Sequence, residues 1–455
     1  MSISESFSYF LIFEKSMELY YSFSILIVLA TIFEFINHRL LRLPSAIGIM
    51  IIAVSISLIL AMFGDALLPK TTESLISLIT KIDFTEILMG AMLNFLLFAA
   101  AIHINIKDLR ENLLPVVMFS SVGIVISTFV VGIGAYYILP LVGVKMPILY
   151  CLVFGALISP TDPVAVLSVL KNAKVSKSLE TKVAGESLFN DGTAVVVFTV
   201  ILQLATGKNI DLTLENILML LIREAGGGLV LGFVLGFVAL RAMQKINEYI
   251  FSVLVTLSVV MGGYLIAHSL HISGPLTMVS AGLLIGNHIM GHMDEKSFEV
   301  KSETRDYLLK FWELIDEILN AVLFLFIGLV LLMMKEMNKY VLSGVICIAI
   351  VLIARWVSIL LSAIFMASKN RFSPQTIKVL VWGAIRGGVS IALAISIPKG
   401  TYSNVIISLT YCVVVFSIIV QGLTIGKMVN PNKLAEDDNI FNRFIQRMDQ
   451  RRRNK

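Results

Sequence analysis

The chain has 455 residues, of which 57% are hydrophobic and only 15% are charged. This composition excludes an ordinary soluble globular protein and indicates an integral membrane protein. Basic loops and a basic tail facing water or lipid headgroups explain the formal net charge of +5, so this charge predicts no nucleic-acid partner.

Apolar runs long enough to cross a bilayer core recur along the whole chain. Because lipid cannot satisfy exposed backbone groups, these runs are expected to be helices. The predicted fold class is an all-α membrane protein with about 13 transmembrane helices. The spans are predicted at about 19–37, 46–63, 85–103, 114–139, 147–170, 183–206, 216–240, 249–269, 273–290, 311–334, 340–366, 377–397 and 403–426.

The first span has no basic leader and no small-residue cleavage site, so it is expected to be retained. About 25 basic residues fall in loops on one side of the membrane and about 8 on the other. The positive-inside rule places the richer side in the cytoplasm of a cell membrane. Residues 1–18 are then expected outside, 19–427 in the membrane domain, and 428–455 in a short basic cytoplasmic tail.

A few ionisable residues remain inside these spans, where an unpaired charge costs about 3 kcal/mol or more. Setting aside an adjacent Arg–Glu pair in the seventh span, three carboxylates accompany two guanidinium groups. One negative charge is left over, and either a proton or a metal cation can neutralise it. A site that accepts one or the other is a simple exchanger. The five residues are Asp162, Glu186, Asp191, Arg355 and Arg386.

The fifth span contains two prolines three positions apart, which predicts a break in its helix. Pro163 suits the first position of a new half-helix, and Asp162 suits its cap at the positive end of the helix dipole. Carbonyl groups freed near Thr161 are potential ligands for a hard cation. The alternative is a proline kink that serves packing alone.

The twelfth span contains Gly383, Gly387 and Gly388 around Arg386, which predicts a second break. Under the predicted topology the two broken spans run in opposite directions, as expected for inverted repeats whose crossing holds the substrate. Arg386 is interpreted as a structural counter-charge for Asp162, with substrate contact as the alternative.

The sixth span places Glu186, Ser187, Asn190 and Asp191 on one helical face. With a carbonyl from the broken fifth span, they offer oxygen ligands suited to Na⁺ or Li⁺. A carboxylate here can alternatively be a structural pairing group. We expect no cofactor, only the transported Na⁺ or Li⁺ and H⁺.

Four segments resemble the signatures of NhaP-type monovalent cation:proton antiporters, relatives of the animal Na⁺/H⁺ exchangers. They read SPTDPVAV at 159–166, GESLFNDGTAVVVF at 185–198, WELIDEILNAVLF at 312–324 and WGAIRGGVSIALA at 382–394. The resemblance implies a thirteen-helix fold, alternating access and a homodimer in the membrane. It implies a core bundle at about 114–206 and 340–427, dimerisation helices at about 19–103 and 249–334, and a linking helix at about 216–240.

The resemblance also implies residue roles. Asp191 is the expected ion- and proton-binding carboxylate, and the Asn-Asp pair that it forms with Asn190 is associated with electroneutral one-for-one exchange. Ser187, Thr161 and Asp162 are its expected partners in binding. Glu186 is expected to pair with Arg355, and Asp162 with Arg386. The chain departs from some members at Ala99, where a glutamate ligand often stands.

Three other functions share these features. K⁺/H⁺ exchange is the alternative within the carriers, and the sequence does not separate it from Na⁺/H⁺ exchange. A cation channel needs a continuous pore, whereas broken helices within one chain favour a carrier. An ion sensor would need an output domain, and no large soluble segment is predicted.

Overall fold

The computed structural model describes residues 21, 23–67, 88–164, 166–167, 170, 175, 177–207, 215, 219, 222–246, 248–290, 302–334, 337–365, 374–400 and 402–429. Every regular element within these ranges is helical, as predicted. The predicted amino-terminal segment 1–18 and nearly all of the tail 428–455 lie outside the described residues.

The helices follow the predicted spans closely. Their bounds are Phe23–Leu41, including the π-helical turn Asn37–Leu41, then α2 Ser45–Leu67, α5 Leu93–Ile102, α6 Ile106–Glu111, α7 Leu113–Val117, η3 Met118–Val122, α8 Gly123–Ile138, α9 Ile148–Ile158, α11 Lys177–Ala205, η5 Ile222–Gly226, α13 Gly227–Lys245, α14 Tyr249–Ser269, α15 Gly274–Ile289, α16 Ser302–Val330, α17 Met337–Phe365, α18 Pro374–Trp382, α19 Gly388–Ile395, α20 Ser403–Phe416, η7 Ser417–Gln421 and α21 Gly422–Met428.

Nine helices in the described ranges are long and apolar enough to cross a membrane. The other four predicted spans coincide with shorter helices. Two of these are the spans with predicted breaks, where α9 ends at Ile158 and where α18 and α19 are separated by residues 383–387. The remaining two contain α5 and α15. Length alone therefore undercounts spans that are interrupted, because each half-helix is too short to cross.

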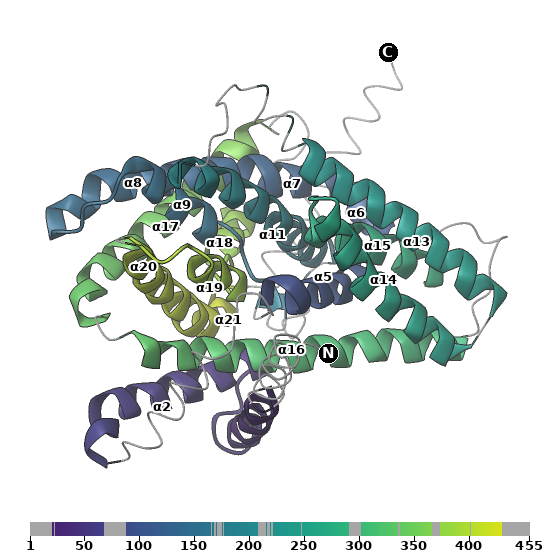
Figure 1. Cartoon of the computed structure of the whole chain (residues 1–455), viewed down its shortest axis with the longest axis horizontal. Coiled ribbons are helices and arrows are strands. Elements are labelled where there is room, and N and C mark those ends of the chain that lie inside the picture. The colour runs from purple at the N-terminus through teal and green to yellow at the C-terminus, as the bar shows by residue number, and fades with distance from the viewer. Residues whose placement is uncertain are drawn as a thin grey trace, which may run out of the picture.

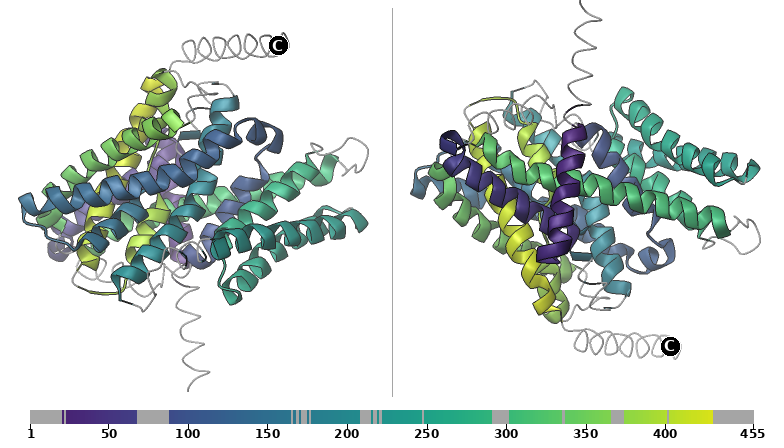
Figure 2. Two further views of the ribbon diagram at one scale, coloured as in Figure 1. Left: turned by 90° about the horizontal axis from the view of Figure 1, so that it is seen from above. Right: turned by 90° about the horizontal axis from the view of Figure 1, so that it is seen from below.

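The helices form two groups with α11 between them (Figure 1). The site-side group contains α8, α9 and α17 to α20, and the flanking group contains α5, α13, α14 and α15. Helix α16 runs along both groups, packing on α19 in one and on α5 and α14 in the other. Seen from below, the first helix and α2 lie on the outside of α16 (Figure 2).

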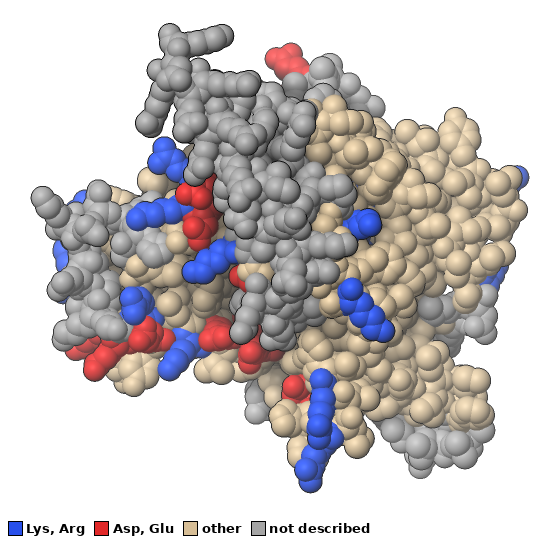
Figure 3. Space-filling model, turned by 180° about the vertical axis from the view of Figure 1, so that it is seen from behind, with Lys and Arg blue, Asp and Glu red and all other residues tan. Residues whose placement is uncertain are grey.

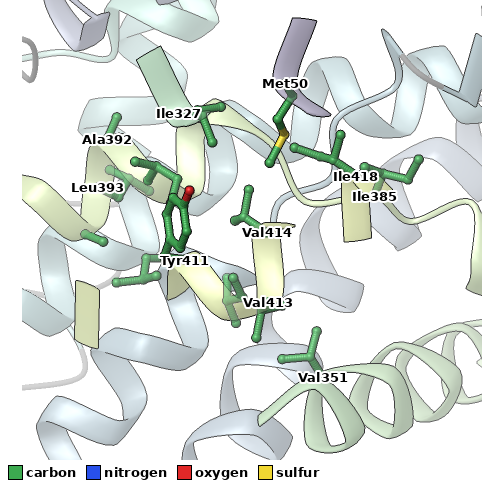
Figure 4. Packing of buried hydrophobic residues seen from close by; sticks show 14 of the residues in the cluster. Met50, Ile327, Val351, Ile385, Ala392, Leu393, Tyr411, Val413, Val414 and Ile418 are labelled. Atoms are coloured by element: carbon green, nitrogen blue, oxygen red, sulfur yellow. The ribbon is translucent and has the colours of Figure 1, made fainter. Parts of the chain in front are cut away.

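Each group has its own hydrophobic core. In the site-side core, the side chains of Met50, Ile327, Val351, Leu393 and Tyr411 converge from α2, α16, α17, α19 and α20 (Figure 4). On one outer face, charged side chains gather toward one side and the lower edge, and the other side carries few of them (Figure 3). Many large apolar side chains are exposed on the molecule, among them Phe129, Phe233 and Leu254. A membrane would cover such a surface, because apolar patches of this extent are rare on soluble monomers.

Candidate functional site

The two predicted breaks meet each other. The backbone N–H of Asp162 donates to the carbonyl of Ile385, with 2.7 Å between nitrogen and oxygen. Neither backbone group belongs to a continuous helix, so each satisfies the other inside the membrane domain. This contact places the fifth and twelfth spans across one another, as the fold prediction requires.

Asp162 caps the half-helix that follows it. Its Oδ1 accepts the N–H of Val164 at 2.9 Å, and the Leu167 N–H bonds to the Pro163 carbonyl at 2.7 Å. The helix begins at Val164, so Pro163 directly precedes it and does not occupy its first position, contrary to the prediction. The cap holds the Asp162 carboxylate at the positive end of a helix dipole.

Arg386 does not pair directly with Asp162, so the predicted ion pair is wrong as a direct contact. The Arg386 side chain is 1% exposed, and its Nη1 donates to the carbonyls of Ser159 at 2.7 Å and Pro160 at 3.1 Å. In an unbroken helix these carbonyls would accept N–H groups four residues later. Pro163 has no N–H to offer, and the N–H of Val164 is taken by the cap. The guanidinium group therefore satisfies carbonyls that the break leaves free.

Two contacts around this crossing were not foreseen. The Oγ of Ser417 accepts the Arg386 N–H at 2.9 Å, and its single proton faces the carbonyls of Val414 at 2.9 Å and of Arg386 at 3.1 Å. These bonds tie the backbone of the second break to η7. A Cβ added to Gly387 would collide with the Asp162 carboxylate, so glycine is needed for this close approach. A single serine in an apolar span does not indicate a contact with another span. The Gly387-Gly388 pair indicated a loosened helix but not the close approach of Asp162.

The polar face of α11 divides into two networks. Glu186 and Arg355 form a buried ion pair with 2.5 Å between oxygen and nitrogen, and Arg355 also donates to the Leu380 carbonyl. These two residues lie where the predicted pair was expected. Their charges cancel locally, so Arg355 is not available to neutralise Asp191.

Thr161 is the centre of the second network. Its Oγ1 lies 3.2 Å from the Ser187 Oγ and accepts the Asn190 amide at 2.7 Å. All three side chains are buried. The Oδ1 of Asn190 is buried without a hydrogen-bond partner in the described residues. This network joins the broken fifth span to the face of α11 that carries the acids.

Asp191 has neither a hydrogen bond nor an ion pair to any residue that the structure describes. Asp191 and Asp162 are both partly exposed. The negative charge of Asp162 repels a negative charge on Asp191. The next residue, Gly192, packs against Leu276 of α15, since an added Cβ would lie 2.7 Å from its Cδ2. The unpaired carboxylate therefore lies where α11 meets the flanking group.

Ala99 is buried on α5. His103, which follows it by one turn, is exposed at the end of α5 and uses its Nδ1 to contact the Ala99 carbonyl at 2.7 Å. This position gives His103 no contact with Asp191. The structure thus offers no protein side chain from this turn in place of the glutamate.

A multi-pass helical membrane protein with two broken helices crossing beside an unpaired carboxylate has the architecture of a secondary transporter. The family model described as the transmembrane sodium/hydrogen exchanger matches residues 24–430. The chain therefore belongs to the sodium/hydrogen exchanger family, whose members are transporters, and the resemblance seen in the sequence motifs is confirmed.

Its relatives include the Na⁺/H⁺ antiporter NhaP of Pseudomonas aeruginosa, which is 44% identical over 89% of this chain and 94% of its own length. The antiporter ApNhaP of Aphanothece halophytica is 34% identical over 77% of this chain and 66% of its own length. Among solved structures, the sodium proton antiporter MjNhaP1 of Methanocaldococcus jannaschii at pH 8 superimposes with a TM-score of 0.70. That match covers 91% of this chain and 98% of MjNhaP1, and at 19% identity it shows the fold alone.

Proposed function

We propose that this chain exchanges Na⁺, or Li⁺, for H⁺ by alternating access, one cation for one proton and without net charge movement. The observation that carries the proposal is the lack of a partner for Asp191. Glu186 and Arg355 neutralise each other. The remaining charges at the site are the two acids Asp162 and Asp191 and the one base Arg386, whose guanidinium group bonds to the carbonyls of Ser159 and Pro160. One unit of positive charge is missing, and a cation or a proton supplies it.

Competition for this position gives the exchange its coupling. Asp191, Ser187, Thr161 and Asp162 are proposed as the oxygen ligands of a small hard cation. Asn190 orients Thr161 through its amide. When a proton neutralises Asp191, the electrostatic attraction for the cation falls, so the two ions leave and enter in turn.

The relatives named above support Na⁺ as the cation, since each is described as a Na⁺/H⁺ antiporter. Asn190 directly precedes Asp191 in the sequence, so the motif is Asn-Asp and not Asp-Asp. This motif supports the electroneutral stoichiometry. Equal charges then move in opposite directions in each cycle.

The proposal includes a placement in the cell. The excess of basic residues on one side supports a cell membrane with the amino terminus outside and the carboxyl terminus in the cytoplasm. Large apolar side chains are exposed along α13 and α14, including Phe233, Phe237 and Leu254. These surfaces support contact with lipid and with a second copy of the chain, and the flanking group is proposed to stay fixed while the site-side group moves.

Transport by reconstituted protein tests this function. Proteoliposomes holding a pH dye receive a Na⁺ gradient, with and without an imposed membrane potential. Wild-type protein should move protons at a rate that the potential does not change. Asp191→Asn should show no Na⁺-driven proton flux, while Asp306→Asn, at an exposed acid on α16, should match the wild type. Normal flux in Asp191→Asn would refute the assignment, and a faster rate with K⁺ than with Na⁺ would overturn the ion choice.

A further inference from the structure

The connection between α5 and α6 is fastened to α15 by one buried side chain. Asn287 is fully buried, and its Oδ1 accepts the N–H of Ile106 at 2.5 Å. Its Nδ2 donates to the carbonyl of Ile104 at 2.8 Å. The residues on both sides of position 105 are therefore held by a single amide of α15, which lies 181 and 183 positions further along the chain.

The helices on the near side of this connection form a tight pair. A Cβ added to Gly282 would lie 2.7 Å from the Ala101 Cβ, and one added to Gly286 would collide with the backbone of Ile102. The backbones of α5 and α15 therefore touch at Gly286, directly before Asn287, so the connection begins where the two helices are closely packed.

On its far side, the connection leads to the helix that carries the ion site. Leu109 of α6 and Val116 of α7 both pack over Gly185 of α11, each about 3.1 Å from where a Cβ would lie. Gly185 immediately precedes Glu186 and Ser187. Asn112, with φ −109° and ψ 15°, separates α6 from α7. Its N–H bonds to the Leu109 carbonyl at 3.1 Å and its own carbonyl accepts the Val116 N–H at 3.1 Å, so hydrogen bonding links the two helices.

We propose that Asn287 is a positioning residue, which keeps the α5–α6 connection anchored on α15 throughout exchange. The inference rests on the proposed function, in which the helices around α11 move against the flanking group. Asn287 fixes α6 and α7 relative to α15. Because both helices pack on Gly185, Asn287 thereby also positions the polar face of α11 relative to α15.

The test compares Asn287→Leu with Thr277→Val. Leucine keeps the approximate volume but loses both hydrogen bonds to the connection, together with the bond from Nδ2 to the Leu283 carbonyl within α15. Thr277 is buried on the same helix, and its hydroxyl bonds only to the Ser273 carbonyl in the turn before, which makes it a matched control. Rates are normalised to monodisperse protein and measured below the melting temperature of each variant. Asn287→Leu should lower the maximal rate about tenfold and leave the KM for Na⁺ within about twofold, whereas Thr277→Val should change neither.

Hydrogen exchange of the amides in residues 103–112 provides the second readout. In wild-type protein the Ile106 amide should stay protected with and without saturating Na⁺, while Asn287→Leu should expose it. Loss of this protection on Na⁺ addition to wild type, or a normal maximal rate in Asn287→Leu, would overturn the inference. Absence of Na⁺-driven proton flux in the wild type would instead refute the proposed function, so the two failures are distinguishable.

Discussion

The Asn190 amide donates to the Thr161 hydroxyl at 2.7 Å, and this bond connects the polar face of α11 to the broken fifth span. It fixes the hydroxyl beside Ser187, which lies 3.2 Å away. Removing one partner of such a buried hydrogen bond lowers stability by more than the intact bond contributes, because the remaining amide is left buried and unsatisfied.

Thr161→Val removes this hydroxyl and keeps the shape of the side chain. The KM for Na⁺ should rise by about tenfold, which corresponds to the loss of one ligand or one buried hydrogen bond. Thr161→Ser keeps the hydroxyl and should stay within about threefold of wild type. Dye-based proton flux at a series of Na⁺ concentrations measures both, and equal KM values for the two variants would show that the hydroxyl is not used.

Arg355→Met leaves Glu186 buried without its partner. The ion pair is almost completely enclosed, with side-chain exposures of 7% and 3%, so breaking it should cost about 3–5 kcal/mol. The melting temperature in detergent should fall by several degrees and the yield should drop. The double variant Glu186→Gln with Arg355→Met removes both charges and should regain most of the lost stability. A double variant no more stable than the single one would contradict a role in charge pairing.

Gly387→Ala should damage transport because the new Cβ occupies the space of the Asp162 carboxylate. Displacing that group from the crossing should reduce the maximal rate about tenfold or more. Gly262→Ala is the control, since no atom lies within 4 Å of the added Cβ on α14. Rates that fall equally in both variants would point to a general effect of alanine and not to the crossing.

Ser417→Ala should loosen the second break, since the Ser417 hydroxyl accepts the Arg386 N–H and faces the Arg386 carbonyl. We expect a loss of about 1–2 kcal/mol of stability, visible as a lower melting temperature. Ser408→Ala is the comparison, because its hydroxyl bonds only to the Asn404 carbonyl one turn earlier. An unchanged melting temperature for Ser417→Ala would mean that the break is held by Asp162 and Arg386 alone.

Sequence reasoning located both breaks because proline and glycine act on the backbone where they stand. Pro163 removes a donor at a known position, and its consequences for Asp162 as a cap follow from local geometry. Glu186 was matched to Arg355 through the family resemblance, and their close contact agrees with it. The predicted spans 85–103 and 273–290 agree closely with the helical residues 88–102 and with α15, since apolar runs mark both helices.

The partner of Arg386 was missed because charge alone was considered. Asp162 offered the opposite charge, but its carboxylate was already engaged as a cap, while two free carbonyls lay within reach of the guanidinium group. Which acceptor the Arg386 guanidinium group bonds to depends on where the fifth and twelfth spans cross. The sequence pattern does not give the distance between these two spans. The same limit hid Ser417, whose hydroxyl resembles many others in apolar helices until the crossing is known.

The bond from Arg386 to the Ser159 carbonyl joins residues 227 positions apart. During translation, the fifth span is therefore synthesised long before the twelfth span. During that interval the interrupted fifth span lacks the groups that will later satisfy it, so its final shape waits for the twelfth span to insert. A chain that terminates before residue 383 lacks one half of this crossing, which makes the crossing one of the last features of this protein to form.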